Sequence, residues 1–381
     1  MLRSRGVRIG KLFGIPIFLH TSWFVIFALI TFSLENEYAG AHAAWTTQQD
    51  WGLALVTSLL FFGSVLFHEM SHSMVARHYR IPVVSITLFF FGGVAQLNRD
   101  PESAFQEFNI ASAGPASSFV LSGVFYLLSL GAPAGSMGGA LTQWLAYINF
   151  WLATFNLLPG FPMDGGRILR SIVWGWTKSY TKASRLAART GQAIAYGMIG
   201  IGAWEAVRAY QTPGGDIVSG VWLAMIGWFL LSAAKQSYAQ AETRTALEGL
   251  LVSDIMTPEP PIVGREISLE DYAREVNRSK RSSHLVVAHG QLVGMISSDA
   301  LGRVPQDEWG STSVQAAMTP REKLLWAEPG ESALKLLDRM RSVGTQQMPV
   351  IADGSVVGMV TRESIVHALE RHNQMAHPTG A

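Results

Sequence analysis

The sequence predicts an α-helical polytopic membrane protein of about six transmembrane helices with a re-entrant β-hairpin, followed by a cytoplasmic α/β region of two tandem repeats. Only 15% of the 381 residues are charged, whereas soluble proteins usually have about 25%. Long charge-free stretches fill the first 235 residues, and an internal repeat of β-branched segments follows from about residue 240. These three observations together predict a membrane half and a soluble half.

Charge-free runs predict the membrane helices. Residues 12–34, 51–67, 108–163 and 217–234 contain no Asp, Glu, Lys or Arg. A helix needs about 20 apolar residues to cross a bilayer, so the longest run holds two helices, divided at the glycine-rich residues 131–139. The predicted helices are 13–34, 51–77, 107–130, 139–158, 187–209 and 217–235.

Basic residues predict the orientation of these helices. With six spans, arginine and lysine concentrate in the segments on one side, and acidic residues dominate the loops on the other side. Because cytoplasmic loops carry the excess of basic residues, we expect a multi-pass protein of the cell (plasma) membrane whose N-terminus and repeat region are cytoplasmic. The formal net charge of +1 gives no sign of a nucleic-acid partner.

An internal repeat organises the soluble half. Asp254–Pro258 (DIMTP) recurs as Ala316–Pro320 (AAMTP), and Leu292–Ser297 (LVGMIS) recurs as Val356–Thr361 (VVGMVT). Such a repeat indicates two copies of one supersecondary unit. The predicted strands are 285–288, 292–296, 348–351 and 356–360, and the predicted amphipathic helices are 269–279 and 331–343.

A metal-binding motif stands at the end of the second apolar run. His68 and His72 are four residues apart, so on a helix both imidazoles lie on one face and can bind the same ion. Glu69 lies beside that ion, where a general base can take a proton from the attacking water. This spacing also occurs on surface helices of soluble proteins, but the seventeen charge-free residues before it argue against a solvated helix.

Asp164 is the expected third ligand. The chain has no cysteine, so a metal must be held by His, Asp or Glu. Asp164 is the first charged residue after the run 108–163, and Pro159 and Pro162 end the preceding helix, which lets the carboxylate turn back into the helix bundle. The two glycines that follow permit tight turning. The alternative is a helix N-cap at the membrane surface.

The segment 85–97 predicts a hairpin or re-entrant loop, because β-branched and aromatic residues surround a central Gly-Gly. Its unpaired backbone groups must be shielded from lipid by protein or water. A free strand edge at Gly92, Gly93 and Val94 can hold an extended substrate by strand addition. A purely structural connector is the alternative.

Two further features have a structural and a functional interpretation. Asn156 can donate a hydrogen bond to the oxyanion of a tetrahedral intermediate, or can bond to another helix. The residues alone leave both roles open. Ala113-Gly114-Pro115 indicates a kinked third helix that packs closely, and packing alone explains it.

The membrane half resembles the site-2 protease family of intramembrane metalloproteases. The matching elements are His68-Glu69-x-x-His72, Gly92-Gly93, Ala113-Gly114-Pro115 and Asn156-x-x-Pro159-x-x-Pro162-x-Asp164-Gly165, in the family's order over nearly all of residues 1–235. The resemblance implies one catalytic Zn²⁺ bound by His68, His72 and Asp164. It also implies that Glu69 activates water, that Asn156 assists at the substrate carbonyl, and that the site lies nearer the cytoplasmic side.

The repeat resembles a pair of CBS domains, similar to the branch of the family that includes the sporulation-type proteases. The expected domains are a protease domain over 1–240 and CBS domains over 246–305 and 312–372. CBS pairs often bind adenine nucleotides through an aspartate three residues after a Ser/Thr, but those positions hold Ala300 and Ser364, and Asp299 is displaced by one. The resemblance therefore leaves a nucleotide, a protein partner and dimerisation through the CBS domains open.

The leading hypothesis is an intramembrane zinc metalloendopeptidase that cleaves within or near the transmembrane segment of a membrane-anchored, single-pass regulatory protein. This activity is regulated intramembrane proteolysis, and the CBS pair would control it. The alternative from another class is a CBS-gated metal or ion transporter, in which intramembrane His and Asp form an ion pathway. That hypothesis does not explain a glutamate directly after His68. An inactive scaffold is a third alternative, which the intact ligand set disfavours.

Overall fold

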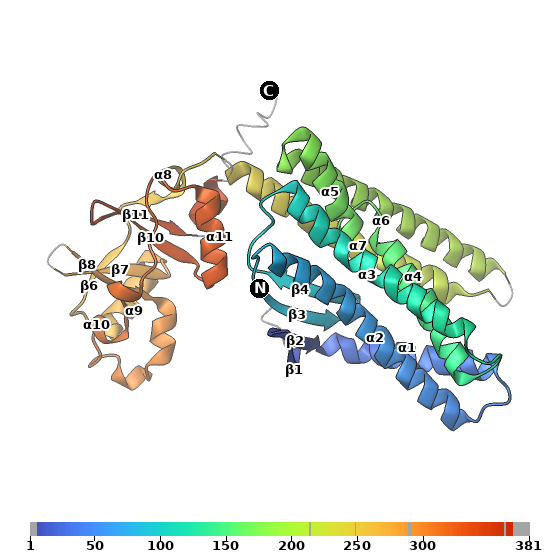
Figure 1. The fold of residues 1–381 in the computed structure, drawn as a ribbon. Coiled ribbons are helices and arrows are strands. Elements are labelled where there is room, and N and C mark those ends of the chain that lie inside the picture. The colour runs from blue at the N-terminus through green and yellow to red at the C-terminus, as the bar shows by residue number, and fades with distance from the viewer. Residues whose placement is uncertain (1–5, 213–214, 248, 289–290, 362, 369–381) are drawn as a thin grey trace. The chain divides into compact units, whose positions relative to one another are not determined.

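The computed structural model describes residues 6–212, 215–247, 249–288, 291–361 and 363–368. The chain divides into two compact units, Met1–Ala241 and Glu242–Ala381 (Figure 1). The boundary falls where the apolar composition ends. Each unit therefore has its own core, and each is described by itself below.

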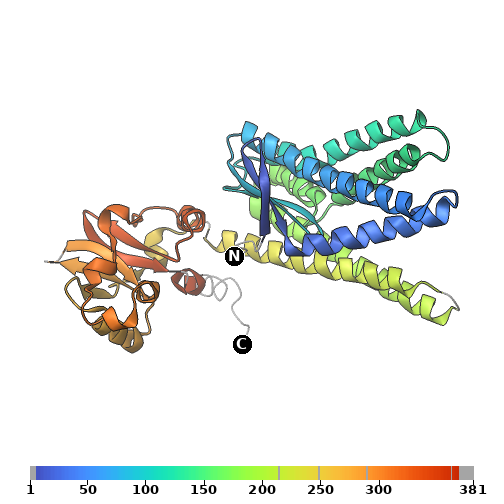
Figure 2. The same ribbon diagram turned by 90° about the horizontal axis from the view of Figure 1, so that it is seen from below.

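The first unit consists of long helices and one small sheet. In Figure 2 its long helices lie side by side. The strands are β1 Gly6–Leu12, β2 Ile15–His20, β3 Val83–Phe89 and β4 Gly92–Leu97. The helices are α1 Thr21–Ala41, α2 Thr47–His78, α3 Ala104–Leu130, α4 Met137–Asn156, α5 Asp164–Thr177, α6 Tyr180–Gln211 and α7 Ile217–Leu247.

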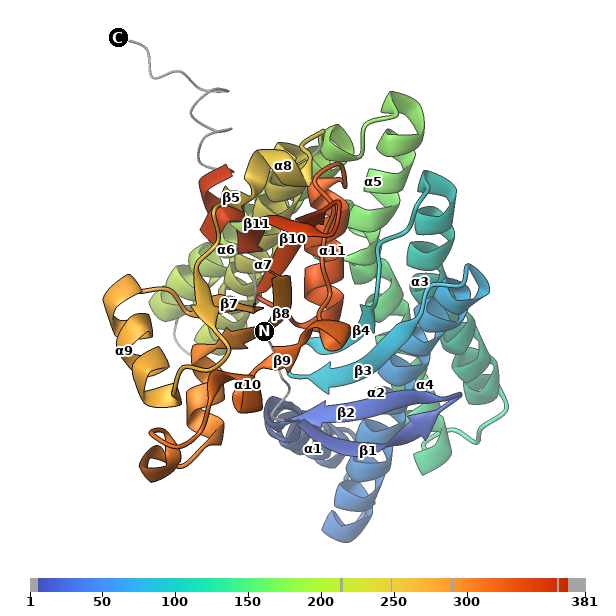
Figure 3. The ribbon, with the colours of Figure 1, turned by 90° about the vertical axis from the view of Figure 1, so that its left-hand side faces the viewer.

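The four strands form a single sheet in the order β1-β2-β3-β4 (Figure 3). The hairpin expected at 85–97 is confirmed as an antiparallel pair, with Phe89 opposite Gly92 across a two-residue turn. Strand β3 joins the N-terminal hairpin by pairing parallel to β2. Strand β4 is the last strand in this order, so within the described residues its outer side is an edge of the sheet.

The predicted helix 13–34 is wrong over its first residues. Residues 15–20 form strand β2, and α1 begins only at Thr21. The side chains of β2 alternate between buried and half-buried: Ile15, Ile17 and Leu19 are buried, and Ile15 and Leu19 belong to one core. An apolar run of this length can form a strand or a helix. Residues 15–20 form a strand because they pair with β1 on one side and β3 on the other.

Among the residues that the structure describes, three helices are long and apolar enough to cross a membrane: Thr47–His78, Ala104–Leu130 and Ile217–Arg244. Together with the composition they indicate a membrane protein. The other predicted spans form the helices α1, α4 and α6, so helix is present at each position apart from the correction above. Six spans and a hairpin at membrane depth remain predictions.

The second unit contains the predicted repeat. Both amphipathic helices are confirmed as α9 Leu269–Ser279 and α11 Ala333–Val343. The four predicted strands are confirmed as β7 Ser283–Ala288, β8 Gln291–Ser297, β10 Gln347–Ala352 and β11 Ser355–Thr361. The shorter elements are α8 Val252–Ile255, β5 Thr257–Pro258, β6 Ile262–Gly264, α10 Val314–Ala317 and β9 Thr319–Pro320, with short 3₁₀ helices at 298–303, 306–308 and 321–323.

The two repeats exchange their first segments. Val252 and Ile255 of α8 are buried in a core with Leu336 of the second repeat, and β5 pairs with β11. Conversely, Val314 of α10 is buried with Tyr272 of the first repeat, and β9 pairs with β8. Each core therefore contains side chains from both copies. The predicted domains 246–305 and 312–372 are separate in the sequence, but each contributes its first helix to the core of the other.

Candidate metal centre

Three ligand atoms converge between α2 and the start of α5. His68 Nε2 lies 3.2 Å from His72 Nε2, and Asp164 Oδ2 lies 3.1 Å from each of these nitrogens. Both histidines are buried, and their helical spacing of four places both rings toward the same point. The structure thus brings together the three residues that the sequence singled out as ligands.

Hydrogen bonds on the far ring nitrogens turn the histidines toward that point. His72 Nδ1 lies 2.6 Å from the Ile110 carbonyl oxygen, which can only accept, so Nδ1 is the donor. A neutral imidazole has a proton on one nitrogen and a free lone pair on the other. In neutral His72 the lone pair is therefore on Nε2, which faces the Asp164 carboxylate. His68 Nδ1 is hydrogen-bonded to the Ser118 hydroxyl at 2.9 Å, a group that can either donate or accept. Protein groups that orient the far nitrogen in this way are typical of metal-ligating histidines.

The donor set fits zinc. Lone pairs of a histidine nitrogen and a carboxylate that face each other repel unless a cation lies between them. Ligand atoms about 2.0–2.2 Å from a tetrahedral zinc are about 3.4 Å apart, close to the distances of 3.1–3.2 Å found here. Three protein ligands also leave one coordination position for a reactant, as catalytic zinc sites do.

Gly114 completes the wall of this centre. A Cβ atom at residue 114 would lie 2.2 Å from His72 Nε2 and 2.5 Å from His68 Nε2. Helix α3 can therefore approach the ligand atoms only because this residue has no side chain. The sequence interpretation of Ala113-Gly114-Pro115 as a packing element missed this direct contact. A glycine inside an apolar helix, next to proline, was the signal that could have pointed to it.

The loop before α5 holds Asp164 in place. Helix α4 ends at Asn156, before both prolines, and Asp164 is the first residue of α5. The glycine pair after Asp164 serves close packing more than turning. A Cβ at Gly165 would lie 2.2 Å from the Leu157 carbonyl oxygen, and one at Gly166 would lie 2.4 Å from the backbone of Gly160. Asp164 is therefore presented by a tightly packed backbone.

Glu69 is in contact with strand β4 and is not one of the three converging ligands. Its Oε2 accepts a hydrogen bond of 3.2 Å from the Ala95 amide. A Cβ at Gly93 would lie 2.4 Å from Glu69 Cγ. The sequence placed Glu69 beside the ion and Gly93 in a separate loop, and the structure brings the two together.

The edge of β4 faces the helix that carries Glu69. Along this strand Gly92 and Val94 lie opposite Phe89 and Thr87, next to the two-residue turn. In an antiparallel pair, residues that bond to the partner strand alternate with residues whose N–H and C=O point outward. The bond from the Ala95 amide to Glu69 identifies Ala95, and by alternation Gly93, as the outward residues.

Asn156 lies at the last position of α4. Its Nδ2 donates to the Leu152 carbonyl oxygen at 2.9 Å, one turn back on the same helix. Among the hydrogen bonds of the described residues, none joins Asn156 to His68, His72 or Asp164. The structure thus does not bring it together with the ligands by direct contact.

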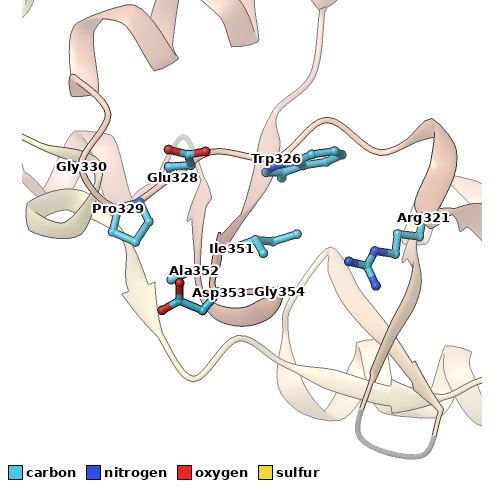
Figure 4. A pocket seen from close by; sticks show the side chains of 9 residues that line it. All are labelled: Arg321, Trp326, Glu328, Pro329, Gly330, Ile351, Ala352, Asp353 and Gly354. Carbon is cyan, nitrogen blue, oxygen red and sulfur yellow. The ribbon is translucent and has the colours of Figure 1, made fainter.

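In the described part of the second unit, two cavities lie beside the hairpin turn of the second repeat. One cavity of about 510 Å³ is bordered by Trp326, Ile351 and the turn at Asp353-Gly354, with Arg321 at its side (Figure 4). Ala300 and Ser364 lie just after the ends of β8 and β11. Ala300 is buried, and the Ser364 hydroxyl is bonded to the Thr361 backbone. The ribose-binding carboxylate is therefore replaced by non-acidic residues at both expected positions.

A helical membrane unit with two histidines, one aspartate and a neighbouring glutamate defines a metal-dependent hydrolase. Comparison with known proteins supports this class. The model of peptidase family M50 matches residues 56–135 and 131–198, and the model of the CBS domain matches 252–304 and 314–371. The chain belongs to peptidase family M50, the site-2 proteases, and is a zinc metalloprotease with a C-terminal CBS pair.

The relatives cover both halves of the chain. The putative zinc metalloprotease sll0528 of Synechocystis sp. is 33% identical over 96% of this chain and 96% of its own length. The putative zinc metalloprotease Rip3 of Mycobacterium tuberculosis is 32% identical over 98% of this chain and 94% of its own. The solved site-2 protease from Methanocaldococcus jannaschii is 31% identical and covers 61% of this chain and 95% of that chain, with a TM-score of 0.45. The two relatives named as putative zinc metalloproteases give no support to the transporter alternative.

Proposed function

We propose that this zinc metalloprotease performs regulated intramembrane proteolysis, cleaving a peptide bond within or near the transmembrane segment of a membrane-anchored, single-pass regulatory protein. The observation that carries the proposal is the position of the ligands. His68 and His72 lie on an apolar helix long enough to cross a membrane, directly after seventeen residues without charge. A site at that depth suits a substrate that is itself in the membrane.

We assign His68, His72 and Asp164 as the ligands of one zinc ion, because their donor atoms converge and their far nitrogens are held. When bound, zinc polarises a carbonyl and makes water a better nucleophile. Glu69 takes the proton of the attacking water and passes it to the leaving amine. The Asn156 amide, which has a second N–H besides the one bonded to Leu152, donates to the oxyanion.

We further propose that the edge of β4 binds the substrate. A transmembrane helix must become extended around the scissile bond before it can be cleaved, and an edge strand stabilises an extended segment by backbone pairing. The proposed substrate-binding residues are Gly92, Gly93 and Val94, of which Gly93 has outward backbone groups and the other two flank it. Because the Ala95 amide bonds to Glu69, a segment paired there would lie beside the proposed general base.

The test is proteolysis by the purified chain in lipid vesicles with single-pass reporter substrates. We expect Glu69→Gln to retain its zinc and to lose cleavage, whereas Glu102→Gln, at an exposed glutamate after β4, should cleave like the wild type. Mass spectrometry should locate the cut in the apolar segment of the substrate. Cleavage by purified Glu69→Gln protein, or cuts confined to the soluble parts of the substrates, would contradict the proposal.

We propose a multi-pass topology of six spans, with both ends on the cytoplasmic side of the cell membrane. The helices α1, α4 and α6 have 21, 20 and 32 residues, and at 1.5 Å per residue each reaches about 30 Å or more. The chain has no native cysteine, so single cysteines can be introduced without background. A membrane-impermeant maleimide added to intact cells should label position 37 or 48 and spare position 99 or 178, all four of which are exposed. The reverse pattern would overturn the orientation.

We propose that the CBS pair controls the protease through α7. This helix is continuous from Ile217 to Leu247, and Leu247 is buried in the core of the second unit. The ligand of the pair would be an adenine nucleotide or a protein partner, and dimerisation through the CBS domains is a further proposal. Truncation after residue 245 should change the cleavage rate, and an unchanged rate would refute control. Calorimetric titration of the full chain with AMP and ATP tests the nucleotide.

A further inference from the structure

The protease unit contains an ion pair with a fully buried carboxylate, which the mechanism above does not use. Glu107 of α3 is 0% exposed, and Arg170 of α5 binds its carboxylate with two nitrogens. Arg170 Nε lies 2.9 Å and 3.1 Å from the two carboxylate oxygens. The Arg170 side chain is 14% exposed. Burying a carboxylate with a largely buried guanidinium is costly unless their hydrogen bonds are well satisfied, and a bidentate pair satisfies them.

Each partner of the pair lies close to one side of the metal centre. Glu107 is one turn before Ile110, whose carbonyl accepts the hydrogen bond from His72 Nδ1. Arg170 is on α5, the helix that begins with Asp164. Glu107 also has Arg167, one turn after Asp164, at 3.9 Å. The ion pair thus joins the helix that orients a histidine ligand to the helix that carries the carboxylate ligand.

Arg170 also holds the loop on the other side of Asp164. Its guanidinium lies over the ring of Phe161, 4.9 Å from the ring centroid, and over the ring of Tyr180, at 4.6 Å. Phe161 is three residues before Asp164, and its amide donates to the Ala187 carbonyl oxygen. A cation stacked on an aromatic ring and bonded in two places has little freedom to turn. Asp164 is therefore fixed by one arginine through contacts before and after it.

We propose that Glu107 and Arg170 are positioning residues that set the distance between Asp164 and the two histidines, and thereby the affinity of the centre for zinc. Neither side chain touches the ligand atoms in the contacts of the described residues, so each acts through the backbone of its own helix. The proposal rests on the assignment of His68, His72 and Asp164 as the zinc ligands.

The experiment separates positioning from mere stability. Glu107→Gln leaves Arg170 buried without its counter-charge, whereas Glu107→Met combined with Arg170→Met removes both charges and keeps side chains of similar length. In the full-length protein, zinc affinity is measured by competition with a chelator, and the ligand geometry by the absorption bands of bound Co²⁺. Thermal unfolding of the metal-free protein reports stability. Tyr79→Phe is the matched control, since it removes a hydrogen bond of 2.6 Å between Asn109 of α3 and Tyr79, without involving α5.

We expect both Glu107 variants to bind zinc about 10- to 100-fold more weakly and to show altered Co²⁺ bands, while Tyr79→Phe stays close to the wild type. Arg170→Lys keeps the charge but loses the bidentate geometry. Its affinity for zinc should therefore lie between that of the wild type and that of the Glu107 variants. A double variant with wild-type stability, wild-type zinc affinity and unchanged Co²⁺ bands would overturn the proposal. Retention of zinc by His72→Ala would instead overturn the assignment of the ligands.

Discussion

His72 Nε2 and Asp164 Oδ2 lie 3.1 Å apart although 92 residues separate them in the sequence. Helices α3 and α4 are inserted between these two residues, and α3 provides the glycine against which both histidines pack. The metal centre is therefore a property of the whole helix bundle.

Replacing the carboxylate ligand should release the metal. In Asp164→Asn the neutral amide removes the only charged ligand, so we expect zinc content after dialysis against a chelator to fall from about one ion per chain to near zero. Elemental analysis of the purified protein measures this. Asp307→Asn, at an exposed position in the second unit, serves as control and should keep its zinc. Full zinc occupancy in Asp164→Asn would rule out this ligand.

Adding one methyl group at Gly114 should destroy the centre. In Gly114→Ala the new Cβ would lie 2.2 Å from His72 Nε2, closer than any real contact, so the ring or the helix must move. We expect loss of zinc binding and of cleavage. Gly123→Ala is the matched control on the same helix, because nothing lies within 4 Å of its Cβ position. Zinc content is measured by elemental analysis and cleavage by the reporter assay, on both variants. A normal zinc content in Gly114→Ala would contradict the prediction.

A methyl group at Gly93 should separate catalysis from metal binding. The Cβ in Gly93→Ala would lie 2.4 Å from Glu69 Cγ and push this side chain, but not the ligands, out of place. We expect cleavage to fall by about 10²-fold or more, the scale of removing a general base, while zinc content stays at the wild-type level. Gly10→Ala, in β1 of the same sheet, has open space at its Cβ and should cleave normally. Equal effects of the two substitutions would argue against the contact with Glu69.

The CBS pair should lose stability in mild acid because of His284. Burial lowers the pKa of His284, and the opposing attraction of Glu275 does not restore it. Among the described residues its Nδ1 has no hydrogen-bond partner, so protonation would leave a buried donor without an acceptor. The unfolded chain binds a proton near pH 6.5 and the folded chain only at lower pH. Stability is therefore complete above about pH 6.5 and decreases as the pH falls below it.

The matched variant is His284→Met, because methionine stands at the equivalent strand position, Met348. Urea midpoints of the CBS half, read by pulsed proteolysis of the full chain, should fall between about pH 7.5 and about pH 5.5 in the wild type and change less in His284→Met. The same pH dependence in both proteins would assign the effect to other groups.

The sequence by itself determined the chemistry and the division of the chain. The spacing of His68 and His72 follows from helix geometry, and the alternation of β-branched segments after residue 280 gave the strands of the repeat, because both signals are local. The charge-free runs located the helices for the same reason. Where an apolar segment is short, as in 15–20, local pattern does not distinguish a strand from a helix, and the assignment was wrong.

Tertiary structure alone decided which distant residues meet. The contact of Gly114 with both histidines, the bond from the Ala95 amide to Glu69 and the ion pair of Glu107 with Arg170 all join separate elements, and none has a periodic signature in the sequence. The same holds for the exchange of α8 and α10 between the repeats. Local pattern reports which face of an element is apolar, whereas the choice of partner depends on the packing of the whole chain.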